Sequence, residues 1–232
     1  QLALVLLSYI WDMLISYIRR KENINRHQPN AILQIKIQEA VSLLQNGQFK
    51  QAERKFARIL KTHPQHPDAL HFQGVVMYKQ GRFKESMNFL EASVSVANDY
   101  AEAHNSLGIV LLEGRKFEEA IKHFSRALEI RPEFVGATVN LGASHQSKGE
   151  FILAEEAYLL AIELDPSNVE AYYRLASICL TLKKNEQALE ASDTALNLSP
   201  LCQHALAYKA LSLQLLNRKN EALLIYNHDD LV

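Results

Sequence analysis

The chain has 232 residues, a length that suits one or two compact domains or one elongated array of repeats. Its 25 Lys and Arg residues are balanced by 26 Asp and Glu residues, which argues against the basic surface that non-specific nucleic-acid binding requires. Apolar residues make up 48% of the chain and charged residues 22%, and this composition excludes a wholly disordered protein.

Residues 1–20 are expected to form an apolar helix. Leu2–Ile18 contains nine Leu, Ile or Val residues and is followed by Arg19-Arg20-Lys21. Nine such residues favour membrane insertion by about 3–5 kcal/mol, whereas Asp12 near the centre opposes it by about 3 kcal/mol. The 17 residues would also span only about 26 Å as a helix, against a hydrocarbon core of about 30 Å. The composition and length of Leu2–Ile18 therefore do not establish a membrane-spanning helix.

The polar residues of this segment lie on one stripe. Ser8, Asp12 and Ser16 are four residues apart, a pattern that is typical of a helix packed against protein. We expect the helix to cover an end or a face of the rest of the chain, or to pair with a copy of itself. A membrane anchor and a fragment of an upstream domain are the alternatives. The chain begins at Gln1, not at Met, which suggests a trimmed or processed chain and leaves a signal peptide unjudged.

A 34-residue period follows a polar linker at residues 21–32. Prolines, which interrupt helices, are separated by 68, 34 and 34 residues at Pro64, Pro132, Pro166 and Pro200. Glycines recur 34 residues apart at Gly74, Gly108 and Gly142. One phase of the period holds the alanines Ala52, Ala120, Ala154, Ala188 and Ala222, and aromatic residues follow four positions later at Phe56, Phe124, Tyr158 and Tyr226. A fixed period of this length indicates a repeat architecture.

One unit, residues 101–134, predicts two antiparallel helices. Apolar residues recur every three or four positions after Leu107, which predicts a first helix that ends at Gly114. A second helix should begin near Lys116 and stop before Pro132. We expect the glycine of the first helix and the alanine of the second to lie where the helices cross. Since one hairpin cannot bury its outer face, each unit needs a neighbour.

These residues resemble the tetratricopeptide repeat. The unit at 101–134 carries the pattern at Leu107-Gly108, Leu111, Gly114, Ala120, Phe124, Ala127 and Pro132. The resemblance covers about 200 residues in six consecutive units: 33–66, 67–100, 101–134, 135–168, 169–202 and the incomplete 203–232. It implies an all-α, right-handed solenoid of helical hairpins, the superhelix of this family. The second unit departs from the pattern, because Ser86, Ser93 and Asn98 stand where alanine, alanine and proline are expected.

No motif for catalysis, a metal or a cofactor is found. The chain has no phosphate-binding loop, nucleophile elbow or zinc-protease signature, so we do not expect an enzyme. His63, His66 and His71 invite a metal site, but no cysteine or acidic cluster completes four ligands, and we expect the first two to be turn residues. Cys179 lies in an apolar phase and is expected in the core. With Cys202 as the only other cysteine, no disulfide framework is possible.

The candidate site is a concave groove. The family resemblance implies that the first helices of the units line such a groove, and the groove-facing phases select His71, Phe72, Tyr78, Asn105, Asn140, Tyr173, Arg174 and Tyr208. This lining suits an extended peptide, because amides can bond its backbone, rings can cover its side chains and Arg174 can bind an acidic group. The alternative is that some of these rings only pack between repeats.

Two specialised versions of the groove are not expected. Chaperone adaptors of this family grip a terminal carboxylate with lysine, asparagine and arginine side chains. This chain has Asn105 and Ile109 where the first pair of clamp residues should stand, and Glu170 opposes an anion. The asparagine ladder of glycosyl-transferring relatives is represented only by Asn140, with Asn105 one position off.

We therefore expect a non-catalytic, cytoplasmic scaffold that binds a protein or peptide and not nucleic acid. One alternative is the substrate-recruiting arm of a larger transferase or oxygenase, because the repeats resemble those placed ahead of such bacterial enzymes and stop at Val232 without a capping helix. The other is an oligomeric or membrane-associated assembly factor that uses Leu2–Ile18 for homo-oligomer or membrane contact.

Overall fold

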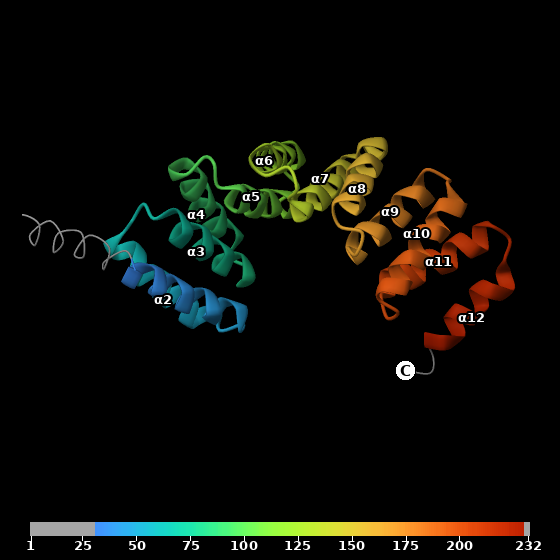
Figure 1. Ribbon diagram of the computed structural model, residues 1–232, viewed down its shortest axis with the longest axis horizontal. Helices are drawn as coiled ribbons and strands as arrows, with labels where there is room; N and C mark the ends of the chain where they lie inside the picture. Colours follow the sequence, from blue (N-terminus) through green and yellow to red (C-terminus); the bar gives the residue numbers. More distant parts are fainter. Residues whose placement is uncertain (1–30, 230–232) are drawn as a thin grey trace, which may run out of the picture. The chain divides into compact units, whose positions relative to one another are not determined.

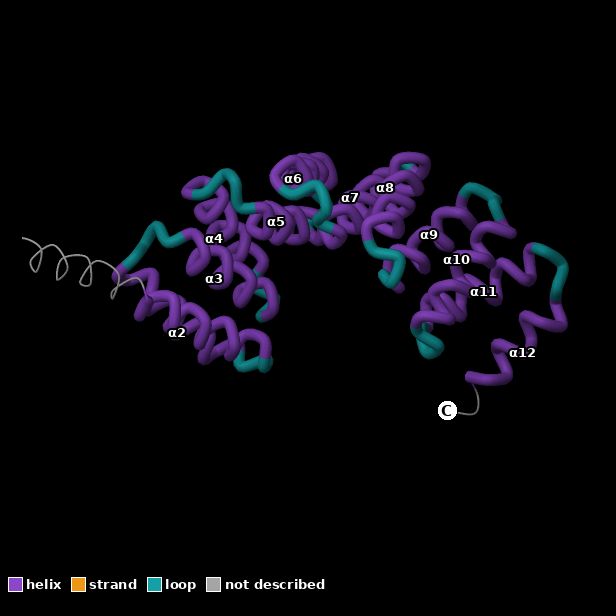
Figure 2. Tube along the Cα trace, in the orientation of Figure 1, coloured by secondary structure: helices purple, strands orange, loops and turns teal. Residues whose placement is uncertain are grey.

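A computed structural model describes residues 31–229 of the chain, with side chains up to residue 225, and every regular element in this range is an α-helix (Figures 1 and 2). The predicted N-terminal helix and residues 21–30 of the linker lie outside the described residues. The chain divides into two compact units, Gln1–Val96 and Ala97–Val232, which we describe separately. None of the helices within residues 31–229 is long and apolar enough to span a bilayer.

The first unit holds a helix at residues 31–45 followed by α2 (Phe49–Thr62), α3 (Pro67–Lys79) and α4 (Phe83–Val96). Its core contains Phe56, Ile59 and Met77. The two serines that depart from the family pattern are buried in α4, and both find partners in α3. Ser86 Oγ donates to the Gly74 carbonyl at 2.8 Å, and Ser93 Oγ donates to the Pro67 carbonyl at 3.0 Å. These bonds satisfy the hydroxyls that replace methyl groups here.

The second unit is built from four successive helical pairs. They are α5 (Ala101–Glu113) with α6 (Phe117–Ile130), α7 (Val135–Lys148) with α8 (Phe151–Leu164), α9 (Val169–Thr181) with α10 (Asn185–Leu198), and α11 (Gln203–Leu215) with α12 (Lys219–Asp229). The predicted helix ends at Gly114, Lys116 and Pro132 are confirmed by α5 and α6.

The first helices of these pairs form one continuous face. Backbone contacts join α5 to α7, α7 to α9 and α9 to α11, whereas α6, α8 and α10 have no Cα atoms within 8 Å of one another. The second helices α6, α8 and α10 therefore do not touch one another, and each packs only against first helices.

The small residues lie where the paired helices cross, as the sequence predicts. A methyl group on Gly108 would meet the Phe124 ring at 2.6 Å, and one on Gly142 would meet the Tyr158 ring at 2.6 Å. Ala120 and Ala154, four residues before these rings, are fully buried. The aromatic side chain therefore fills the space that glycine leaves in the facing helix.

The turn inside each pair needs one residue in the left-handed conformation. Glycine supplies it at Gly149 with a φ of 80°. In the α5–α6 turn it is supplied by Arg115, with a φ of 58°, and not by Gly114, which has an ordinary φ of −74°. Lys183 takes this conformation in the α9–α10 turn, and Asn217 takes it in the α11–α12 turn.

Candidate binding surface

Two asparagines bridge α5 and α7 on the face of the first helices. Asn140 Nδ2 donates to Asn105 Oδ1 at 3.0 Å, and both side chains are half-buried. The two residues are 35 positions apart, one more than the 34-residue period. Asn105 is therefore shifted by one position from the place equivalent to Asn140, and it is still the hydrogen-bond partner of Asn140. The pair keeps an amide donor on Asn105 and a carbonyl acceptor on Asn140, the two groups that a peptide backbone complements.

Gln146 links α7 to α9 and to the interior. Its Nε2 donates to Ser177 Oγ at 3.4 Å, and its Oε1 accepts from the Tyr158 hydroxyl at 2.9 Å. Tyr158 is fully buried, and burial raises its pKa to about 12. The phenol therefore stays neutral and acts as a donor that fixes the amide.

Arg174 is paired within its own helix. Its Nε donates to Glu170 Oε1 at 2.8 Å, one turn earlier on α9. The guanidinium carbon lies 5.9 Å from the centre of the Tyr173 ring. Burial lowers the pKa of Arg174, but the hydrogen bond to Glu170 and nearby charges outweigh this effect and raise the pKa overall, so the side chain stays charged. An acidic ligand at Arg174 would have to tolerate Glu170, as the sequence indicates.

An aromatic contact joins α9 to α11. The Tyr173 ring stacks on His204 with centroids 4.8 Å apart and planes 17° apart. Burial is the main cause that raises the pKa of Tyr173. Tyr208 is partly buried against the core cluster that contains Leu175 and Ile178. This part of the face offers a stacked pair of rings beside a cation.

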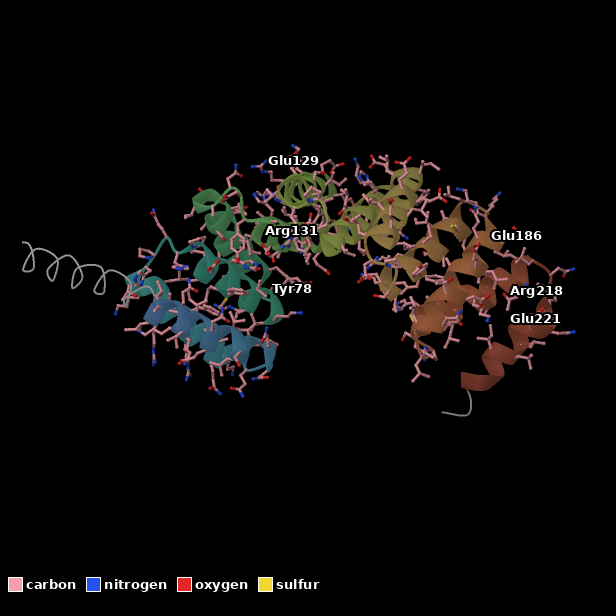
Figure 3. The ribbon with its side chains drawn as sticks, in the orientation of Figure 1. Tyr78, Glu129, Arg131, Glu186, Arg218 and Glu221 are labelled. Carbon is pink, nitrogen blue, oxygen red and sulfur yellow. The ribbon has the colours of Figure 1, made fainter. Side chains whose placement is uncertain are left out.

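The three candidates in the first unit have different environments. His71 is only 5% exposed and packs against Phe72, whose ring stacks on Phe56 with centroids 5.8 Å apart. Both rings thus pack between helices, so we leave them out of the site. Tyr78, labelled in Figure 3, makes an edge contact with Phe83 at 5.8 Å. Tyr78 belongs to the first compact unit, whereas α5, α7, α9 and α11 belong to the second.

The histidines near Pro64 have local roles. His66 caps α3 by accepting from the Ala69 amide at 3.5 Å, and His63 Nδ1 lies 2.8 Å from Thr62 Oγ1. Within residues 31–229, no three His, Cys, Asp or Glu side chains gather closely enough to hold a metal ion. Cys179 is buried, and burial raises its pKa to about 11, which keeps the thiol protonated.

Family comparisons agree with this geometry. Models described as tetratricopeptide repeat match residues 43–108, 101–134, 136–168 and 157–190, which together run through most of the chain. The chain belongs to the tetratricopeptide repeat family. No curated protein matches this tetratricopeptide repeat protein.

Solved structures share the fold of this tetratricopeptide repeat protein. PilW, described as a widely conserved type IV pilus biogenesis factor, has a TM-score of 0.79 at 19% identity, over 85% of this chain and 91% of PilW. MamA has a TM-score of 0.63 at 24% identity, over 69% of this chain and 94% of MamA. YrrB, described as a TPR protein with an unusual peptide-binding site, has a TM-score of 0.62 at 22% identity, over 75% of this chain and 90% of YrrB. At these identities the likeness shows the fold.

The sequence of this repeat protein did not reveal Gln146 as a member of the surface. The available signal was Tyr158, which occupies the aromatic phase filled by Phe124 in the preceding unit. A buried tyrosine hydroxyl usually has a hydrogen-bond partner, so tyrosine in place of phenylalanine indicates a polar neighbour. Gln146 is that neighbour.

Proposed function

We propose that this tetratricopeptide repeat protein is a non-catalytic scaffold that binds an extended peptide segment across α5, α7, α9 and α11. The observation that carries the proposal is the row of side-chain contacts that joins each first helix to the next: Asn105 with Asn140, Gln146 with Ser177, and Tyr173 with His204. Such contacts hold amides and rings in place before a ligand arrives, which lowers the entropy lost on binding.

The chemistry of the row favours one kind of ligand. The asparagine pair offers a donor and an acceptor to an extended backbone, and the stacked Tyr173 and His204 rings can cover an apolar or aromatic side chain. The terminal nitrogens of Arg174 can bind a carboxylate, while Glu170 limits the affinity for acidic groups. A mainly apolar segment with a single acidic residue would match this surface best. YrrB, which shares the fold and is described as having a peptide-binding site, supports a peptide ligand by analogy.

A displayed library of unstructured 12-residue peptides provides the probe. We expect peptides selected on the full chain to bind about tenfold more weakly to Asn140→Ala and to Tyr173→Ala, because each change removes about 1–2 kcal/mol of hydrogen bonding or ring contact. Dissociation constants are measured by fluorescence polarisation. Glu170→Gln should strengthen binding of those selected peptides that carry an acidic residue.

The matched control is Lys122→Ala on the exposed side of α6, which leaves the face of the first helices unchanged. Circular dichroism verifies that each variant keeps its helicity. Selected peptides that bind Asn140→Ala and Tyr173→Ala with the wild-type constant would place the binding site elsewhere. A library that yields no specific peptide would argue against peptide binding altogether.

A further inference from the structure

Helix α8 has an unusually apolar outer surface. Its sequence, FILAEEAYLLAIEL, holds three glutamates and otherwise only apolar residues and Tyr158. The large apolar side chains that point outward are 37–55% exposed: Ile152, Leu153, Leu159, Leu160 and Leu164. The residues of the repeat pattern that α8 buries, Ala154, Tyr158 and Ala161, lie on the other side of the helix. Neighbouring large apolar side chains that stay exposed in this way are typical of a docking surface.

The exposed residues form two strips. At 100° per residue, Ile152 and Leu159 follow one edge of the outer face, and Leu153, Leu160 and Leu164 follow the other. The first strip continues into a cavity of about 350 Å³ between α8 and α10, whose floor is supplied by α9. Apolar floor residues include Tyr172, Leu175 and Cys179. The surface therefore contains a groove with a mainly apolar base, the kind of surface on which the apolar face of a helix can dock.

Negatively charged side chains lie between the two apolar strips and on the neighbouring helix α10. Neither α8 nor α10 contains a lysine or arginine. Glu156 and Glu163 lie between the two apolar strips, and Glu186 and Glu190 stand on α10, with Glu186 labelled in Figure 3. Within the described residues, none of these four carboxylates forms an ion pair. Glu155, beside the cavity, is already paired with Lys184 at 2.6 Å.

Charge is divided unevenly between the two compact units. Residues 1–96 hold 13 basic and 7 acidic residues, whereas residues 97–232 hold 12 basic and 19 acidic residues. The near-zero charge of the whole chain therefore hides a basic first unit and an acidic second unit. The acidic surface of residues 97–232 therefore favours a basic ligand segment.

We propose that the N-terminal segment Leu2–Lys21 docks on this outer groove of α8 and α10. The segment combines nine Leu, Ile or Val residues with the cations Arg19, Arg20 and Lys21, and so complements both the apolar strips and the unpaired carboxylates. As a helix, Leu2–Ile18 would be about 26 Å long, close to the roughly 21 Å of α8. The Ser8, Asp12 and Ser16 stripe would remain in water. This site is separate from the peptide-binding face.

Trp11 makes the proposal testable in the full chain, because it is the only tryptophan. In buffer without lipid, its fluorescence should be blue-shifted and protected from acrylamide relative to the chain in urea. In Leu159→Glu/Leu160→Glu, the emission should shift to the red and quenching should rise to the level seen in urea. Both leucines are exposed, so the substitutions leave the core intact.

The control applies the same chemistry elsewhere in the second unit. Leu223→Glu/Leu224→Glu alters two exposed leucines of α12 and should leave Trp11 protected. Three outcomes would overturn the proposal: Trp11 fully quenched in the wild-type chain, protection unchanged by the α8 variant, or protection that appears only with vesicles of phosphatidylcholine and phosphatidylserine. The second outcome points to self-pairing of the segment or to another surface, and the third to a membrane.

A cross-linking measurement does not depend on the double variant. A photo-reactive amino acid at position 160 of the full chain should cross-link to peptides from residues 2–21, whereas the same group at position 126 of α6, one period earlier, should not. The mass of the product tells whether the segment comes from the same chain or from a second copy, and both results support docking on α8. Cross-links from position 160 that lack residues 2–21 would contradict it.

Discussion

Helices α6 and α8 occupy the same place in successive repeats and bury the same kind of residue, yet their outer surfaces differ. Both place a small alanine and a large ring against the preceding helix, Phe124 in α6 and Tyr158 in α8. On its outer side, α6 carries mainly charged residues, including Glu129, which extends from the helix in Figure 3. The position of Glu129 is also acidic in α8, where it is Glu163, but four other polar positions of α6 are apolar in α8. Glu118, Glu119, Ser125 and Arg126 correspond to Ile152, Leu153, Leu159 and Leu160.

The comparison separates two kinds of constraint on the sequence. The buried side is dictated by the crossing of paired helices, because a larger or smaller residue there meets its neighbour at once. The outer side touches no other helix of the array, so its composition is free to serve solubility in α6 and contact in α8. Differences between repeats on the outer side therefore carry functional information that the repeat pattern does not.

The largest expected effect lies on the buried side that the two helices share. Phe124→Ala and Tyr158→Ala should each lower the free energy of unfolding by about 3–5 kcal/mol, because each leaves a cavity beside a glycine that cannot fill it. Urea titration followed by circular dichroism measures the loss. If one variant lost several times more free energy of unfolding than the other, the two aromatic side chains would not have equivalent roles in the two repeats.

The outer side supplies the contrast to these cavities. Lys122→Ala in α6 alters an exposed side chain and should change the free energy of unfolding by less than about 0.5 kcal/mol. Leu153→Ala in α8 should lower it by about 1 kcal/mol in the full chain, because the proposed docking of residues 2–21 covers this side chain. An effect of Leu153→Ala as small as that of Lys122→Ala would count against docking of residues 2–21 on this side of α8.

The buried side is also what the sequence predicted well. The 34-residue period placed Ala120, Phe124 and Tyr158 in the core, and proline and glycine marked the helix ends correctly, because steric rules act within a few residues. The period did not identify Arg115 as the left-handed residue, since Gly114 offered a more obvious choice one position away. Turn conformation depends on where the next helix must start, which one residue type does not determine.

The surface was predicted less completely than the core. Helical phase selected Asn105, Asn140 and Tyr173 for one face, but the partner of each side chain depends on rotamers and on the offset between helices. The same phase also selected His71, which the neighbouring rings bury. Repeat position thus predicts the direction of a side chain better than its exposure.

A smaller effect should distinguish the repeats through pH. His104 on α5 and His123 on α6 face each other with Nδ1 atoms 3.0 Å apart, whereas the next repeat has Thr138 and Ala157 at these positions. Burial is the first cause that lowers the pKa of both rings, and mutual repulsion adds to it at His104.

Because both pKa values are lower in the folded state, the unfolded chain binds protons first as the pH falls. Stability should be complete above the ordinary histidine pKa of about 6.5 and should decrease as the pH falls below it. His123→Ala, which introduces the residue found in α8, should reduce this acid sensitivity in urea titrations at pH 7.5 and pH 5. Around the pair, Arg126 disfavours the charged form of His104 and Glu119 favours that of His123. Equal acid sensitivity in wild type and variant would assign the effect to other groups.

A further difference between the two helices is a half-buried hydrogen bond that α8 makes and α6 cannot. Tyr158→Phe gives α8 the ring of α6 and removes the hydroxyl that donates to Gln146 at 2.9 Å. The free energy of unfolding should fall by about 1 kcal/mol, because Gln146 loses a partner while the ring packing is kept. Combining Tyr158→Phe with Gln146→Ala should recover part of this loss if the cost comes from the unpaired amide oxygen. The same hydroxyl orients Gln146 toward Ser177, so peptide affinity should also weaken slightly in Tyr158→Phe, and a loss of stability without any change in affinity would remove Gln146 from the binding surface.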